Sequence, residues 1–130
     1  MDNEIINSIV AFIQPFQLDR VVNALRHLPD FPGMSVSDVR GFGRHGAHQP
    51  HKGERGEVDA FAPSVRLEIF CRAPELGAIV EALREAAHTG NSGDGKILIG
   101  TLAWAVAIRT GAEGPAAIHG KDTSVGSVDR

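Results

Sequence analysis

Four strand-like runs and two amphipathic segments of helical spacing follow one another along this chain, and their order restricts the fold. Residues 5–13 are almost wholly apolar and rich in isoleucine and valine, which is typical of a buried strand. Residues 18–28 and 74–88 each carry an apolar stripe at helical spacing, with charged residues on the other side. The remaining strands are predicted at residues 34–44, 65–72 and 97–109. The last of these ranges is long enough for one strand or two.

The order strand, helix, strand, strand, helix, strand predicts an α+β, ferredoxin-like βαββαβ fold. Right-handed crossovers place the four strands in one antiparallel sheet with both helices on the same face. The opposite face then has no cover within one chain, and its near-continuous apolar strands predict that other copies of the chain bury it. We therefore expect an oligomer. Because this fold hosts many functions, the function has to be argued from the site.

Composition excludes several classes of protein. The formal net charge of -3 and the lack of clustered basic residues predict no binding to nucleic acid. The single cysteine, Cys71, cannot form an internal disulfide, so nothing indicates an oxidising compartment. The chain starts with acidic rather than basic residues and holds no run of roughly 18 apolar residues, so we expect neither a signal peptide nor direct membrane insertion. These observations predict a cytoplasmic protein.

A long loop is expected at residues 45–63, where glycines, histidines and charges alternate without a period. Loops longer than about 12–15 residues in compact domains are usually functional or disordered. His45, His48 and His51 recur every third residue, and such a loop can wrap imidazoles around Zn²⁺, Cu²⁺ or Ni²⁺. That alternative describes a metal-binding module for metal homeostasis or efflux. Three solvated histidines are the favoured interpretation, because the loop is glycine-rich and offers no acidic or cysteine partner.

Two glycine motifs resemble nucleotide-binding fingerprints and fail the test of context. Residues 41–46 match G-x-G-x-x-G, but the segment after them cannot begin the helix that a dinucleotide site needs. Residues 90–96 match a P-loop as far as Lys96, yet Ile97 replaces the Ser/Thr that holds Mg²⁺, and a helix precedes the loop instead of a strand. Closely spaced glycines beside a lysine still suit an anion. A hairpin turn, or a helix C-cap at Gly90, explains the same spacing equally well.

Single residues have plainer interpretations. Asp94 beside Lys96 lacks a partner nucleophile or base, so it is expected to shape its turn, and no enzyme is predicted. Cys71 is expected to lie in the core, and Trp104 in the core or an interface.

Taken together, the motifs resemble those of the PII nitrogen-regulatory family from about Ile5 to Ile118. Several uncommon elements occur in the family's order, which makes the resemblance specific. The matching segments are Gln14-Pro15-Phe16 with Leu18-Asp19, Gly33-Met34-Ser35-Val36, Val39 to Arg44, Val65 to Ile69, Thr89-Gly90, Gly93 to Ile97, and Ile108 to Gly111.

The resemblance implies a homotrimer that binds ADP, AMP or ATP in the clefts between subunits, without a cofactor and without catalysis. A mobile T-loop then docks on an unidentified target protein or leaves it. The implied nucleotide-binding residues are Gly33 and Ser35 near the adenine, Gly41, Gly43 and Arg44 at the T-loop base, Phe70 as an apolar wall, Gly93, Asp94, Gly95 and Lys96 around the phosphates, and Arg109 from the neighbouring subunit.

The same resemblance divides the chain. Residues 1–111 are expected to form the PII-like domain, with the T-loop at about 43–63. Residues 112–130 are expected to form a C-terminal tail that is flexible or folds over the site.

Departures from the family pattern fall on the positions that recognise 2-oxoglutarate. His45 replaces a glutamine, Gly46 replaces a lysine, and Ser64 replaces the lysine that pairs with the keto-acid carboxylate. We therefore expect weak or absent 2-oxoglutarate binding. A smaller anion such as bicarbonate is a candidate co-ligand near Arg44 or Lys96.

Two more departures concern regulation. The chain has no tyrosine, and Glu57 stands where some members are modified on one, so control by tyrosine modification is excluded. Ala107 replaces the first arginine of the R-I-R-T-G element, which predicts that ADP or AMP binds better than ATP. This profile is similar to divergent branches associated with carboxysomes and bicarbonate transporters, so a membrane transporter or a carboxysome-related protein is the candidate target.

Overall fold

A single four-stranded antiparallel sheet organises the part of the chain that the computed structural model describes, residues 4–42 and 61–118. The strand order is β2-β3-β1-β4, and all three neighbouring pairs are antiparallel. The strands are β1 (Ile6–Ile13), β2 (Ser35–Gly41), β3 (Ala62–Arg72) and β4 (Lys96–Leu102). The helices are the 3₁₀ turn η1 (Pro15–Gln17), α1 (Leu18–Arg26), α3 (Ala73–Ala87) and α4 (Pro115–Ile118).

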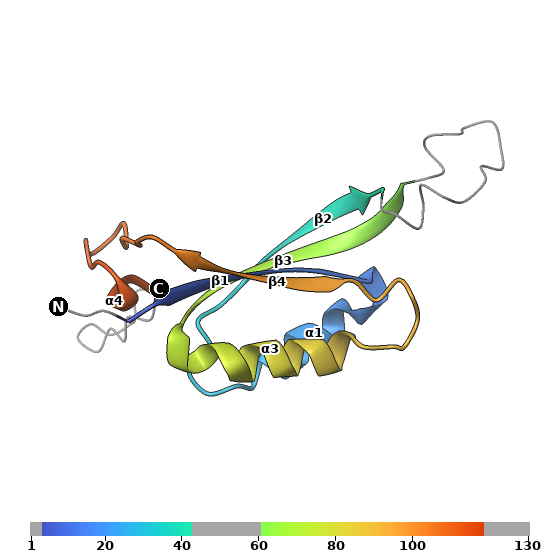
Figure 1. Cartoon of the computed structure of the whole chain (residues 1–130), viewed down its shortest axis with the longest axis horizontal. Coiled ribbons are helices and arrows are strands. Elements are labelled where there is room, and N and C mark those ends of the chain that lie inside the picture. Colours follow the sequence, from blue (N-terminus) through green and yellow to red (C-terminus); the bar gives the residue numbers. More distant parts are fainter. Residues whose placement is uncertain (1–3, 43–60, 119–130) are drawn as a thin grey trace.

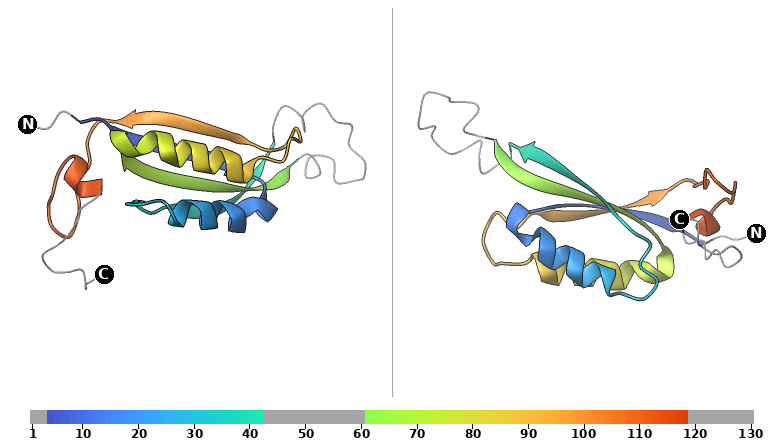
Figure 2. Two further views of the ribbon diagram at one scale, coloured as in Figure 1. Left: turned by 90° about the horizontal axis from the view of Figure 1, so that it is seen from below. Right: turned by 180° about the vertical axis from the view of Figure 1, so that it is seen from behind.

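Both long helices cover the same face of the sheet, as Figures 1 and 2 show. Local sequence explains why α3 begins directly after β3. The Glu75 carboxylate accepts a hydrogen bond from the Arg72 amide at 3.0 Å. Pro74 lies in the first turn, where its lack of an N–H costs nothing because amides there have no partner within the helix. The ferredoxin-like fold and its antiparallel sheet, predicted from the order of elements, are therefore confirmed.

The hydrophobic core lies between the helices and the helix-facing side of β1 and β3. Alternate residues of β3 point into it, from Val65 to Cys71, and they meet Leu25 of α1 and Leu83 of α3, which are fully buried. Burying one such aliphatic side chain contributes about 1.5–3 kcal/mol. Cys71 is 0% exposed, which confirms the predicted core position, and burial followed by the nearby charge of Glu75 raises the pKa of its thiol to about 11.

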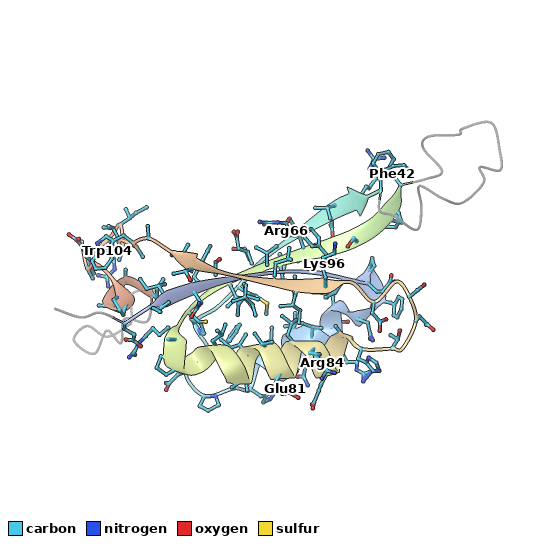
Figure 3. All side chains as sticks on the ribbon, in the orientation of Figure 1. Phe42, Arg66, Glu81, Arg84, Lys96 and Trp104 are labelled. Carbon is cyan, nitrogen blue, oxygen red and sulfur yellow. The ribbon has the colours of Figure 1, made fainter. Side chains whose placement is uncertain are left out.

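The other sheet face carries partly exposed side chains. On this face Phe70 is 37% exposed and Leu98 is 49% exposed. The two long helices do not cover it, and the short helix α4 lies against one part of it, beside Glu68 and Phe70. Figure 3 shows Arg66 and Lys96 on this side and Arg84 of α3 on the helical side. The open face expected from the sequence is therefore present in the described single chain, and it carries charged side chains, among them Arg66 and Lys96, beside its apolar ones.

The chain after β4 differs from a continued strand. β4 ends at Leu102, and residues 105–114 then fold back as a short C-terminal hairpin with one bridge, Val106 to Glu113. The amide of Gly114 donates to the Ala105 carbonyl at 2.9 Å, and the amide of Ala107 donates to the Ala112 carbonyl at 2.8 Å. The predicted "strand or two" is thus one strand plus this hairpin, because the chain reverses at Gly111, whose φ is +78°. Among the described helices, none has the length and apolar character that crossing a membrane requires.

Candidate functional site

The glycine loop, residues 89–95, is shaped around the carboxylate of Asp94. This carboxylate accepts hydrogen bonds from the Thr89 amide at 2.7 Å, from the Gly90 amide at 2.8 Å and from the Thr89 hydroxyl. These hydrogen bonds lower the pKa of Asp94 below its ordinary value, and the bond from the Thr89 hydroxyl has the largest effect. The imidazole of His88, 3.7 Å away, also lowers it. A carboxylate so engaged is a poor general base. Its contacts support the interpretation that Asp94 shapes the turn.

Two glycines in this loop lie close to the end of β1, and at Gly95 the backbone of that strand leaves no room for a side chain. Gly95 has a φ of +103°, and a Cβ there would lie 1.8 Å from the Phe12 carbonyl oxygen of β1. A Cβ on Gly93 would lie 2.7 Å from Nε2 of Gln14, which donates to the Gly93 carbonyl at 2.5 Å. The loop therefore lies directly against the end of β1, which holds its backbone in place without a ligand.

A row of charged and aromatic residues crosses the open sheet face beside this loop. Phe12 of β1 is paired with Lys96 of β4 on one side and with Arg66 of β3 on the other. Directly opposite residues share a face, so Lys96 and Arg66 lie on the same face as Phe12, one on each neighbouring strand. Arg66 also forms an ion pair with Glu68 at 3.4 Å. Arg66 was absent from the site predicted from sequence, although its alternation with buried Val65 and Leu67 placed it on this face.

A cavity of about 380 Å³ adjoins the start of β4. Arg84 of α3 and His88, the residue directly after this helix, line it together with Asp94, Gly95 and Lys96. Apolar side chains make up the rest of its wall: Phe12, Ile13, Val80, Ala87, Ile97 and Ile99. We call this end of the molecule the phosphate end.

A second cavity, of about 280 Å³, lies on the open face near the start of β2. It brings together Gly33 and Ser35, which were predicted to lie near the adenine, and Phe70, which was predicted as an apolar wall. The rest of its lining was not among the predicted site residues: Pro32, Met34, Glu68, and Ala117 and Ile118 of α4. Gly33 has a φ of +112°, a conformation that glycine adopts without strain. We call this cavity the base end.

Arg109 lies in the C-terminal hairpin, beyond the far end of β4. Six residues separate Lys96 from Leu102 along this strand, which at about 3.3 Å per residue is about 20 Å. Figure 1 shows the hairpin and the glycine loop at opposite ends of the sheet. Within one chain, the structure therefore does not bring Arg109 to Lys96.

Several predicted residues lie outside the described part of the chain: Gly43, Arg44, His45, His48 and His51. Gly41 is described and ends β2 opposite Ala62. Next to this pair, the rings of Phe42 and Phe61 lie 5.1 Å apart between centroids. Among the described residues, no group of three His, Cys, Asp or Glu side chains is placed to hold a metal ion.

These features define a class of protein: a ferredoxin-like α+β protein with an uncovered sheet face and a glycine loop of the kind that suits an anion. Comparison with known families then gives the identity. The sequence pattern of the family "Nitrogen regulatory protein P-II" matches residues 6–112. The chain belongs to the PII nitrogen regulatory protein family.

Individual relatives agree with this assignment. The chain is 40% identical over 111 residues to the nitrogen regulatory proteins P-II of Azospirillum brasilense and of Rhizobium meliloti (strain 1021), covering 85% of this chain and 97% of each relative. Among solved structures, it is similar to Arabidopsis thaliana PII bound to citrate, with a TM-score of 0.67 and 30% sequence identity over 87% of this chain and 92% of that one.

Family membership settles part of the prediction. PII proteins are non-enzymatic signal transducers, so the prediction that the chain is not an enzyme is confirmed. Proteins of the family form trimers and bind effectors. The carboxysome- or bicarbonate-associated branch is not distinguished by these relatives and stays a prediction.

Proposed function

We propose that this PII protein senses adenine nucleotides, with ADP or AMP favoured over ATP, at clefts between the subunits of a homotrimer. The T-loop then regulates a target protein according to the nucleotide bound. One observation supports the proposal above the others. The glycine loop and Lys96 lie at one end of the sheet, while the base-end cavity and Arg109 lie toward the other.

The phosphate end has the chemistry that an anionic group needs. Because the Asp94 carboxylate and the Thr89 hydroxyl already accept hydrogen bonds from the amides of residues 89–91, we place the phosphate-binding amides at Gly93 and Gly95. Lys96 adds a point charge next to them, and Arg44 is the second cation that the family resemblance implies there. Several donors and cations together suit the oxygens of a polyphosphate.

The base end supplies the other half of a nucleotide site. Its wall combines an aromatic ring, Phe70, with the backbone of Gly33 and the hydroxyl-bearing Ser35. A flat base can pack on the apolar ring while its polar edge meets backbone and side-chain groups. The resemblance assigns Gly33 and Ser35 to the adenine and Phe70 to an apolar wall.

The separation of the two ends is the reason for an intersubunit site. A nucleotide that contacts the base end and Arg109 of one protomer reaches the glycine loop of the next protomer only if the copies pack head to tail. Such a heterologous contact closes into a ring when its rotation permits. The uncovered face with Phe70 and Leu98 gives the same protomers apolar surface to bury.

The preference for ADP or AMP follows from charge. Ala107 stands where the family pattern has an arginine, which leaves Arg109 as the hairpin's contribution of positive charge near the terminal phosphates. ATP carries one more phosphate than ADP, so the absence of this cation lowers the affinity for ATP more than the affinity for ADP.

Weak 2-oxoglutarate binding is proposed for a similar reason. The Ser64 hydroxyl donates to the Ile13 carbonyl at 3.3 Å, so this position holds a neutral, already engaged group in place of a cation. A charge-assisted contact contributes about 1.5–3 kcal/mol, so its loss lowers affinity by roughly one to two factors of ten. Bicarbonate near Arg44 or Lys96 is the co-ligand we propose instead. The proposed location of this protein is the cytoplasm, and its proposed target is a membrane transporter or a carboxysome-related protein.

Isothermal titration calorimetry with ADP, AMP and ATP tests this function directly. We expect Lys96→Ala and Arg44→Ala each to weaken ADP binding by about tenfold or more, which corresponds to the loss of one charge-assisted contact. Arg26→Ala, which removes an exposed cation from the helical side, is the matched control and is expected to leave affinity unchanged. A monomer in light scattering, or unchanged ADP affinity in both site variants, contradicts the proposed site.

A further inference from the structure

A contact between an aromatic side chain and the C-terminal hairpin lies next to the base end. The indole Nε1 of Trp104 donates to the Glu113 carboxylate at 2.8 Å. The same ring packs on the backbone of Gly114, because a Cβ there would lie 3.0 Å from Cη2 of Trp104. We call these three residues the Trp104 clasp. Figure 3 shows Trp104 at this end of the molecule.

The clasp holds the segment from which α4 starts. Gly114 is buried and donates its amide to the Ala105 carbonyl at 2.9 Å, on the opposite arm of the hairpin. Its own carbonyl accepts from the Ala117 amide at 2.9 Å, and Pro115, the first residue of α4, is also buried. The position of α4 therefore depends on where the clasp holds Gly114.

The helix α4 in turn forms one wall of the base-end cavity. Ala117 and Ile118 line it from one side, while Gly33 and Ser35 line it from another and Phe70 lies on β3. The walls come from segments that are far apart in sequence, and the hairpin carries α4 to the cavity. A shift of α4 changes the width of the cavity without touching the glycine loop at the other end of the sheet.

We propose that the Trp104 clasp sets the width of the base-end cavity, so that Trp104 and Glu113 are positioning residues for the base of the bound nucleotide. The inference rests on the proposed nucleotide site and adds a determinant of base affinity to it. A clasp that only stabilises the hairpin would change thermal stability without any preference among ligands. A positioning clasp affects ligands that carry a base and spares those that do not.

The electrostatic effect of replacing Glu113 is opposite in sign to the effect expected from a changed cavity, so the test can separate the two. Removing the negative charge of Glu113 strengthens the attraction of any anion to this region, whether or not it carries a base. Weaker binding of ADP after Glu113→Ala therefore cannot come from charge. It has to come from the altered cavity.

Calorimetric titrations of the full-length protein with ADP and with inorganic pyrophosphate compare a ligand with a base to one without. We expect Glu113→Ala to weaken ADP binding about fivefold, the effect of one lost hydrogen bond and a displaced wall, and to leave pyrophosphate binding unweakened. Glu113→Gln keeps an oxygen acceptor for the indole and is expected to restore most of the ADP affinity. Glu85→Ala removes an exposed acid from α3 and serves as the control.

Tryptophan fluorescence gives an independent reading. Trp104 is the chain's only tryptophan, so its emission reports on the clasp alone. We expect ADP to shift the emission of the wild-type protein and pyrophosphate to leave it unchanged.

The outcomes separate the two proposals. If the wild-type protein binds ADP but Glu113→Ala binds it equally well, or loses ADP and pyrophosphate to the same degree, the clasp proposal is overturned and the nucleotide site stands. If the wild-type protein binds no adenine nucleotide, the proposed function itself is wrong, and the positioning role is overturned with it.

Discussion

Replacing Gly95 with alanine is the sharpest test of the idea that the glycine loop must lie against β1. The new Cβ would lie 1.8 Å from the Phe12 carbonyl oxygen and 2.9 Å from its carbonyl carbon, both backbone atoms. Phe12 cannot move aside easily, because β1 is a central strand and this residue is paired with Arg66 and Lys96 on its two sides. The loop therefore has to move away from β1.

The cost has two parts. An alanine held at a φ near +103° is strained by about 1–3 kcal/mol. Moving the loop also breaks the pairing of Phe12 with Lys96 at the start of β4, which removes about 1 kcal/mol of backbone hydrogen bonding. The sum is about 2–4 kcal/mol, and at about 4 °C per kcal/mol for a chain of this size the melting temperature falls by about 8–16 °C.

Two other glycines provide matched controls in differential scanning calorimetry. An added Cβ at Gly77, an exposed position in α3, meets nothing within 4 Å, so Gly77→Ala is expected to stabilise the protein by about 0.5–1 kcal/mol. At Gly93 the nearest atom is the end of the flexible Gln14 side chain, so Gly93→Ala costs less than Gly95→Ala. A Gly95→Ala protein that melts with the wild type and binds ADP equally well refutes the close approach.

Three further predictions concern other parts of the molecule. Because burial raises the pKa of Cys71 to about 11, a thiol reagent at pH 8 is expected to modify the native protein far more slowly than the unfolded one, and equal rates argue against burial. The lowered pKa of Asp94 means that its stabilising effect is present above the ordinary pKa of 3.8 and lost as pH falls below it, so Asp94→Asn is expected to flatten the acid limb of the stability profile. Ile108 is 100% exposed in the single chain, and Ile108→Asp is expected to shift the oligomer toward monomer in light scattering; an unshifted oligomer shows that the tip lies outside the interface.

Much of the fold was predictable from local sequence. The apolar run of β1, the alternation along β3 and the stripes of α1 and α3 follow from burial on one side of each element, and burial leaves a period in the sequence. The glycine loop was predictable for a related reason. Gly95 has a positive φ and lies too close to β1 for a Cβ, so only glycine fits there and the glycine in the sequence indicates the turn.

Features that depend on register or on distant contacts left no such record. Arg66 meets Phe12 only because β1 and β3 pair in one particular register, which the sequence does not state. Trp104 is 52% exposed in the single chain, so it does not lie in the core, and the interface position stays a prediction. Its hydrogen-bond partner, Glu113 of the C-terminal hairpin, was not predicted. The walls that Ala117 and Ile118 give to the base-end cavity depend on how that hairpin folds back. No local pattern carries this information.

The position of the T-loop base relative to the glycine loop explains how a nucleotide can act on a target. β2 ends at Gly41 opposite Ala62, and β4 begins at Lys96, at the same end of the sheet in Figure 1. Three strand spacings of about 4.8 Å separate β2 from β4, and Lys96 is level with Ser37, four residues before Gly41. Gly41 and Lys96 therefore lie roughly 20 Å apart. Phe42 and Phe61 contact each other where the chain leaves β2 and re-enters β3. The separation of Gly41 from Lys96 exceeds the Debye length of about 8 Å at physiological salt, so a charge at Lys96 is largely screened from the T-loop base. In the proposed function, a nucleotide that couples the two therefore has to contact both. Under the proposed function, coupling of this kind needs no long pathway through the core, because the sheet fixes the distance between Gly41 and Lys96 and the nucleotide acts by shifting a population of conformations.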